Sequence, residues 1–252
     1  MAAEPAGRRA GGVDGSHEPG RNVYGIEVGV VMLDTRFPRP PGDVGNARTF
    51  PFPIAYEIAQ VTPESMLGGA DAAVVANAAA AGRRLVDRGV RAVATSCGLM
   101  ARYQAELAGA VGAPVLSSSM LQLPMVLRLL PSHQQVVLLT FDARALIEGG
   151  HLAAVGLTEA EIARVLVVGM DEARVFRTTI LGQDRRLDPS AIAEEVLAQL
   201  RVALPEEHRV GGIVLECTNL SPYSERVRAE FGLPVWDVRT AVNWLGAGFG
   251  EC

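Results

Sequence analysis

The sequence predicts an α/β protein of two pseudo-symmetric lobes, each built on a parallel sheet, with the active site between them. The main observation is an internal repeat, in which residues 90–115 align without a gap with residues 210–235 at an offset of 120 positions. This alignment places Cys97 on Cys217. A unit that occurs twice in 252 residues indicates a duplicated half rather than a stacked array.

Each copy of the repeat is typical of a strand, a sharp turn, a helix and a second strand. Residues 92–95 and 212–215 are short apolar runs, which suit strands buried on both faces of a sheet. Each run leads to a cysteine, Cys97 or Cys217, at the carboxyl end of the strand, where open α/β sheets bind ligands. Each cysteine also precedes a predicted helix, whose N-terminal partial positive charge favours a thiolate over a thiol. We therefore expect the two cysteines to face each other across a cleft.

The remaining elements follow from apolar patterns and from helix breakers. Further strands are predicted over residues 25–33, 52–61, 135–140 and 162–168. Further helices are predicted over residues 70–88, 120–130 with an interruption near Pro124, from about 143 to 155, 189–202 beginning at Pro189, and 236–245.

The two cysteine motifs resemble those of the aspartate/glutamate racemase superfamily, whose members work without pyridoxal phosphate. The segment LECTN at residues 215–219 is similar to the second motif of that family, and ATSCG at residues 94–98 occupies the place of the first. On the order of elements, the resemblance covers residues 24–245. It implies two flavodoxin-like lobes and a catalytic role for Cys97 and Cys217.

The motifs also depart from the family pattern, so the resemblance does not carry over a substrate. Glutamate and aspartate racemases usually have Asn-Thr after the first cysteine, where this chain has Gly98 and Leu99. They usually have His or Glu where this chain has Asn219.

The domain boundaries are predicted from the repeat and from composition. Residues 1–22 are rich in Gly, Ala, Arg and Pro and have no apolar segment of a secretory signal, so a disordered leader and a cytoplasmic protein are expected. The first lobe is expected to comprise residues 23–121 and 225–252, and the second lobe residues 122–224.

Composition excludes several functional classes. The chain contains no lysine, because all 23 basic residues are arginine, and this excludes pyridoxal phosphate enzymes and lysine-based aldolases. The net charge of −5 gives no reason to expect nucleic acid or an anionic membrane surface, and no apolar run approaches the ~20 residues of a membrane span. The four histidines share no metal-ligand spacing. We expect neither a cofactor nor a metal.

Residues 35–46 form a long segment whose prolines and glycines forbid regular structure. The segment follows the first strand and should lie over the same sheet edge as the cysteines. A substrate-covering loop and a solvated or interface loop are equally compatible with its length.

Two thiols suit the racemisation of a carboxylic acid at its α-carbon. One thiolate removes the proton on one face and one thiol returns it on the other, and the roles exchange with direction. An ordinary thiol has a pKa of ~8.5, so the helix N-termini or the substrate must lower it. The substrate carboxylate needs neutral donors, and candidates near strand ends are Ser96, the Gly98 amide, Thr140, Thr218 and Asn219.

Two of the site assignments come from the resemblance to the racemases. Thr140 resembles the position where the family places a hydroxyl facing the substrate carboxylate, and Asp34 follows the first strand as an Asp does in glutamate racemases. Asp34 is accordingly predicted to orient or deprotonate a thiol, with a helix cap or loop contact as the alternative.

The prediction is a cofactor-independent racemase or epimerase of an amino acid or related carboxylic acid, with Cys97 and Cys217 as acid and base. Two alternatives stay open. One is a relative that uses its cysteines differently, such as an arylmalonate-type decarboxylase or a maleate-type cis–trans isomerase. The other is a non-catalytic small-molecule binding protein on the same fold. The only partner expected is a small carboxylic or amino acid, and a homodimer is left open.

Overall fold

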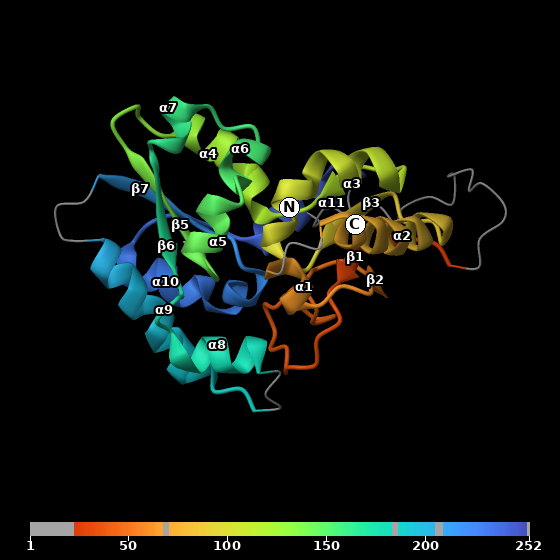
Figure 1. The fold of residues 1–252 in the computed structure, drawn as a ribbon, viewed down its shortest axis with the longest axis horizontal. Helices are drawn as coiled ribbons and strands as arrows, with labels where there is room; N and C mark the ends of the chain where they lie inside the picture. The colour runs from red at the N-terminus through yellow and green to blue at the C-terminus, as the bar shows by residue number, and fades with distance from the viewer. Residues whose placement is uncertain (1–22, 68–70, 183–185, 205–208, 251–252) are drawn as a thin grey trace, which may run out of the picture.

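Two lobes lie side by side in the computed structural model, which describes residues 23–67, 71–182, 186–204 and 209–250 (Figure 1). Each lobe is organised around a four-stranded sheet, and every strand pair in both sheets is parallel. The predicted fold class, an α/β fold of two similar lobes, is confirmed. The predicted leader over residues 1–22 lies outside the described residues.

The first sheet has the strand order β2-β1-β3-β4. Its central strand β1 is buried along its whole length, as the apolar sequence predicted. One face of the sheet is covered by helices α2 and α3, and the other face packs against the C-terminal helix α11. The elements are β1 Val28–Met32, β2 Ile54–Ile58, α1 Pro63–Leu67, α2 Asp71–Asp87, β3 Ala92–Thr95, α3 Gln104–Val111, β4 Val115–Leu116 and α11 Val238–Ala247.

The second sheet has the order β6-β5-β7-β8. Alternate residues of β5 point to opposite faces, so Val137 and Leu139 pack with α8, α9 and α10, while Val136 and Leu138 pack with α4, α5 and α6. The elements are α4 Leu123–Leu129, β5 Gln135–Thr140, α5 Ala143–Glu148, α6 His151–Ala154, α7 Glu159–Ile162, β6 Val165–Gly169, α8 Arg174–Leu181, α9 Pro189–Ala203, β7 Val210–Leu215, α10 Ser224–Phe231 and β8 Val235–Trp236.

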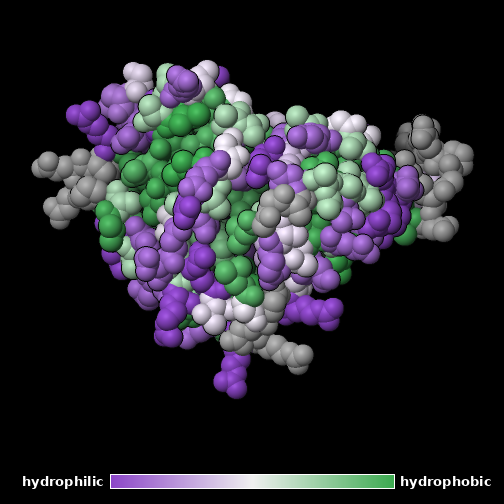
Figure 2. Space-filling model, in the orientation of Figure 1, coloured by the Kyte–Doolittle hydropathy of each residue, from purple (hydrophilic) through white to green (hydrophobic). Residues whose placement is uncertain are grey.

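Strand β6 is an edge strand that is only half-buried along its length. Figure 2 shows apolar side chains on the face of the second lobe where this edge lies, and further apolar side chains between the two lobes. Among the described residues, no helix combines the length and hydropathy needed to cross a bilayer.

The sequence repeat is a structural repeat. In the first lobe β3 leads into the short 3₁₀ helix η1 (Gly98–Tyr103), and in the second lobe β7 leads into η3 (Thr218–Tyr223). Helices α3 and α10 then end at Gly112 and Gly232, which both adopt the left-handed conformation that glycine allows without strain. The helices and the strands β4 and β8 that follow keep the offset of 120 residues throughout.

The structure shifts one predicted lobe boundary. Residues from 225 onward were assigned to the first lobe, but β8 pairs with β7 in the second sheet. The repeat itself requires this placement, because β4 occupies the same position beside β3. The chain returns to the first lobe only with α11, whose Val238, Ala241 and Val242 pack on the first sheet.

Two other element predictions change for local reasons. The predicted helix over 120–130 is divided into η2 (Ser119–Gln122) and α4, whose first turn contains Pro124. The predicted strand over 162–168 begins later, because a capping box between Thr158 and Glu161 starts the short helix α7 just before β6.

Candidate active site

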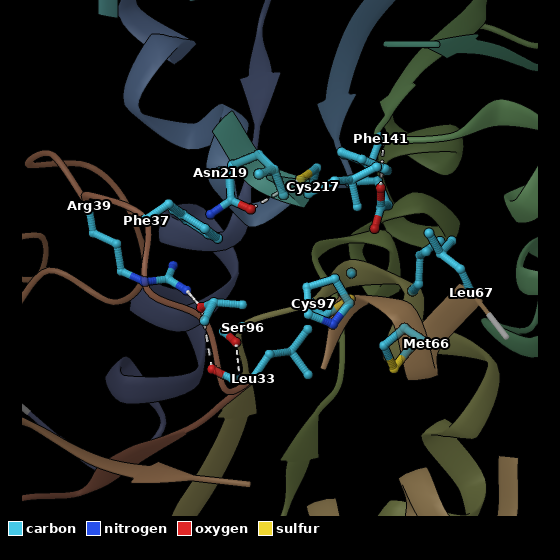
Figure 3. Close-up of a pocket in the computed structure, with 17 residues that line it drawn as sticks. Leu33, Phe37, Arg39, Met66, Leu67, Ser96, Cys97, Phe141, Cys217 and Asn219 are labelled. Atoms are coloured by element: carbon cyan, nitrogen blue, oxygen red, sulfur yellow. Dashed lines mark hydrogen bonds between the residues drawn. The ribbon is translucent and has the colours of Figure 1, made fainter. Parts of the chain in front are cut away.

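Cys97 and Cys217 line one cavity between the lobes. Each follows an inner strand of its sheet, β3 or β7, and each precedes a 3₁₀ helix. Figure 3 shows the two sulfur atoms in the middle of the cavity, with residues of both lobes around them. The cavity volume is about 60 Å³. One water needs roughly 10–15 Å³ on this measure, so the space suits a small molecule.

The cavity wall is mainly apolar. Phe37 and Arg39 lie on one side of the sulfur atoms in the view of Figure 3, and Met66 and Leu67 lie on the other. Arg39 is the cationic side chain among the described residues of the wall. The remaining wall residues are Leu33, Thr35, Pro63, Ser96, Gly98, Leu99, Phe141, Ile180, Leu181, Glu216 and Asn219.

Both thiols are held in the neutral form, contrary to the expectation that helix N-termini would favour thiolates. Burial raises the pKa of Cys97 to about 12, and the nearby charge of Glu216 adds to this rise. The backbone amides of Leu99 and Met100 oppose the shift but do not overcome it. Burial, and secondarily Glu216, likewise raises the pKa of Cys217 well above its ordinary value. The helices that follow are short, so desolvation dominates over the helix dipole.

Glu216 is a functional candidate that the sequence reasoning missed. Glu216 is only 1% exposed, yet it forms part of the wall of the cavity that Cys97 and Cys217 line. Its Oε2 accepts hydrogen bonds from the Thr140 hydroxyl at 2.7 Å and from the Phe141 amide at 3.3 Å. Burial raises the pKa of Glu216 to about 7, against these two hydrogen bonds. The signal in the sequence was a carboxylate that closes an otherwise apolar strand, at the position where the first repeat has Ser96.

The predicted polar residues do lie around the cysteines, but most of their polar groups bond to protein. The Ser96 hydroxyl accepts from the Leu33 amide at 2.8 Å, and the Thr218 hydroxyl donates to the Ser96 carbonyl at 2.7 Å across the lobes. The Thr140 hydroxyl donates its hydrogen bond to Glu216. Of these hydroxyls, that of Thr218 fixes the two cysteine turns against each other. Ser96 and Gly98 lie in the cavity wall, and Asn219 does too.

Asp34 lies away from this arrangement, and Asp43 takes its place. Asp34 is exposed and is absent from the described cavity wall. Asp43 is 1% exposed and accepts from the Asn219 amide at 2.8 Å, while Asn219 accepts from the Cys217 thiol at 3.6 Å. An acidic residue after the first strand is thus linked to the second cysteine through Asn219, from nine positions further along the loop than Asp34.

The loop over residues 35–46 is anchored to the second lobe. Within the loop, Arg39 forms an ion pair with Asp43 at 2.8 Å and donates a hydrogen bond to the Thr35 hydroxyl at 2.6 Å. Gly42 passes so close to Pro222 that a Cβ would lie 2.8 Å from its Cα, and its φ of +97° also favours glycine. The loop is thus a packed part of the cavity wall, to which it contributes Phe37 and Arg39.

The buried carboxylate predicts a pH dependence of stability. Because the pKa of Glu216 is raised from 4.5 to about 7 on folding, the folded state binds more protons than the unfolded state between these values. The free energy of unfolding should therefore fall as pH rises from about 4.5 to 7, by roughly 3 kcal/mol. In Glu216→Gln this contribution should be missing, so the difference between parent and variant changes over this range. Urea unfolding at several pH values measures it, and two parallel stability curves would contradict the assignment.

The structural comparisons identify the class of fold. An aspartate racemase from Picrophilus torridus superposes with a TM-score of 0.54, at 11% identity over 88% of this chain and 94% of that one. Unliganded arylmalonate decarboxylase superposes with a TM-score of 0.51, at 21% identity over 86% of this chain and 89% of that one. The protein has the fold of the aspartate/glutamate racemase superfamily, as its cysteine motifs predicted.

The sequence relatives carry a different name. The dimethylsulfoniopropionate lyase of Durusdinium sp. clade D is 26% identical over 246 residues, which is 92% of this chain and 78% of the lyase. Four further dimethylsulfoniopropionate lyases, from Emiliania huxleyi (strain CCMP1516), are 25–27% identical, and this chain spans 44–65% of their length. No protein-family model matches the sequence.

Proposed function

We propose that this protein is a cofactor-independent lyase. It removes the proton α to the carboxylate of a small carboxylic acid and expels a leaving group from the neighbouring carbon. The observation that carries the proposal is the meeting of two neutral thiols and one buried carboxylate in a small apolar cavity. The proposed substrate is dimethylsulfoniopropionate, the compound for which the sequence relatives are named.

The chemistry of such a substrate matches the two sides of the cavity. A propionate carboxylate suits the side with Arg39, whose guanidinium is a natural carboxylate partner. A dimethylsulfonio group carries a positive charge and apolar methyl groups, which suit the other side of the cavity, with the ring of Phe141 and the side chain of Met66. The thiols of Cys97 and Cys217 keep their protons and donate toward the carboxylate as negative charge builds on it.

Racemisation of an amino acid is the second candidate. It begins with the same removal of an α-proton and differs in the return of a proton from the opposite face. The specific observation in its favour is that the cavity receives one cysteine from each lobe.

The full chain incubated with dimethylsulfoniopropionate in deuterated water is expected to release dimethyl sulfide and leave an unsaturated acid. A panel of amino acids and arylmalonates is tested in parallel. Exchange of an amino-acid α-hydrogen with both enantiomers formed, and no sulfide released, would replace the lyase by a racemase. Carbon dioxide release would indicate decarboxylation, and binding without turnover of any compound would reject an enzyme of this class.

A further inference from the structure

We infer that Glu216, and not a thiol, is the base that accepts the α-proton in this cavity. The inference rests on the proposed function and assigns its proton acceptor. Neither the two-thiol pattern nor the names of the relatives points to this residue. The next residue in the chain is Cys217, and the side chain of Glu216 lies at the turn that follows Cys97.

Two features of the geometry suit the carboxylate of Glu216 to accept a proton. Thr140 and Phe141 hold one oxygen, Oε2, and leave Oε1 directed to Gly98. Gly98 has no side chain, and a Cβ at this position would overlap both Oε1 and the Glu216 carbonyl oxygen. The first cysteine turn therefore leaves room for the carboxylate of the second lobe, and both belong to the cavity wall.

The charges around the cavity favour the same assignment. With a pKa of about 7, Glu216 is half-ionised at neutral pH, whereas the pKa of Cys97 is about 12 and that of Cys217 lies well above its ordinary value. The ionised Glu216 itself raises the pKa of both thiols. Of the three acidic groups in the cavity, the carboxylate of Glu216 is therefore the one that carries the negative charge.

The proposed step balances without any further reactant. The carboxylate of Glu216 takes the α-proton, and the electron pair of that C–H bond becomes the new C=C bond. The bond from the β-carbon to sulfur breaks, and its electron pair leaves with the sulfur, so a cationic sulfonium becomes a neutral sulfide. Glu216 ends protonated and returns the proton to solvent.

The activity test uses Glu216→Gln and Glu216→Asp in the full chain. Turnover by the parent protein should fall as pH drops below about 7, because a protonated Glu216 accepts no proton. Glu216→Gln should lose at least about 100-fold in kcat at pH 8, where the parent carboxylate is ionised, and the limb near pH 7 should vanish. Glu216→Asp keeps the negative charge, but its side chain is one methylene shorter and holds the carboxylate farther from the substrate. Its kcat should therefore fall at least about tenfold.

A second measurement needs no substrate. Alkylation of Cys97 and Cys217 by iodoacetamide at pH 8, followed peptide by peptide by mass spectrometry, reports the thiolate fraction of each. Removing the charge in Glu216→Gln should lower both thiol pKa values and accelerate alkylation by about tenfold for each pKa unit. Glu216→Asp should react at close to the parent rate. Glu195→Gln is the matched control, because Glu195 likewise accepts two hydrogen bonds, from the backbone amides of Val175 and Phe176, but lies outside the described cavity wall.

The two measurements separate the inference from the proposed function. If the parent protein turns over no substrate, the proposed function fails, while alkylation still shows whether the charge of the cavity sits on Glu216. Alkylation of Glu216→Gln at the parent rate would overturn the inference. So would activity of Glu216→Gln within about threefold of the parent.

Discussion

Cys97→Ala and Cys217→Ala are each expected to lower turnover at least about 100-fold. Both thiols line the cavity from opposite lobes, and both are neutral hydrogen-bond donors because burial raises their pKa. Alanine removes the donor and leaves the charge that builds on the substrate carboxylate without a partner. The measurement is kcat for sulfide release, with urea unfolding to show that each variant stays folded.

Serine separates the two roles that a thiol can have. Cys97→Ser and Cys217→Ser keep a hydrogen-bond donor but lose an acidic proton carrier, because a hydroxyl is far less acidic than a thiol. If Glu216 accepts the proton, each serine variant should release sulfide at least about tenfold faster than the matching alanine variant. Racemisation of any amino acid should be lost in all four variants. Serine variants no better than alanine would show that a thiol accepts the proton, and enantiomer-resolved deuterium uptake would show on which face.

The part of the site that sequence predicts well is the part that the repeat controls. Cys97 and Cys217 occupy equivalent positions in two copies that align without a gap. Because the strands are parallel, these positions lie at the carboxyl edge of each sheet. Local signals then suffice, because each strand, turn and helix lies within 26 consecutive residues of one copy. The same logic places β8 in the second lobe, although the predicted boundary did not follow it that far.

The residues that were missed either differ between the two copies of the repeat or lie outside it. Glu216 aligns with Ser96, so the comparison of the two copies treats it as a variable position. Its importance comes from desolvation and from Thr140, which lies 76 positions away in sequence. Asp43 reaches Asn219 across 176 positions through an irregular loop. Contacts of this kind have no periodicity, and the resemblance to the racemases pointed instead to Asp34, the carboxylate that directly follows the first strand.

The position of each cysteine before a helix was a poor guide to the protonation state of its thiol, for a related reason. A helix N-terminus offers only a fraction of a charge to a neighbouring thiolate. Complete burial of a charged group costs much more, and a carboxylate beside the thiols adds repulsion. Burial of Cys97 and Cys217 depends on how the lobes close against each other, which neither copy of the repeat reveals by itself.

Gly98→Ala is expected to abolish activity and to destabilise the protein. The new Cβ would overlap Oε1 and the carbonyl oxygen of Glu216, which is backbone and cannot rotate away. Relief requires the two lobes to separate at the cysteine turns, where Thr218 bonds to the Ser96 carbonyl. We expect a loss of about 1–3 kcal/mol in the free energy of unfolding. We also expect at least a 100-fold loss of kcat, because Glu216 and both thiols shift relative to one another.

The matched control is Gly109→Ala in helix α3, where a Cβ would meet nothing within 4 Å. This change should raise the free energy of unfolding by about 0.5–1 kcal/mol, since alanine is the better helix former, and leave kcat unchanged. Urea unfolding and sulfide release are measured for both variants at pH 8. Parent-like kcat in Gly98→Ala would mean that the contact between Gly98 and Glu216 is dispensable, and the assignment of Glu216 as the base would lose its geometric support. Loss of stability without loss of kcat would confine Gly98 to packing, whereas loss of both supports a glycine that makes room for the base.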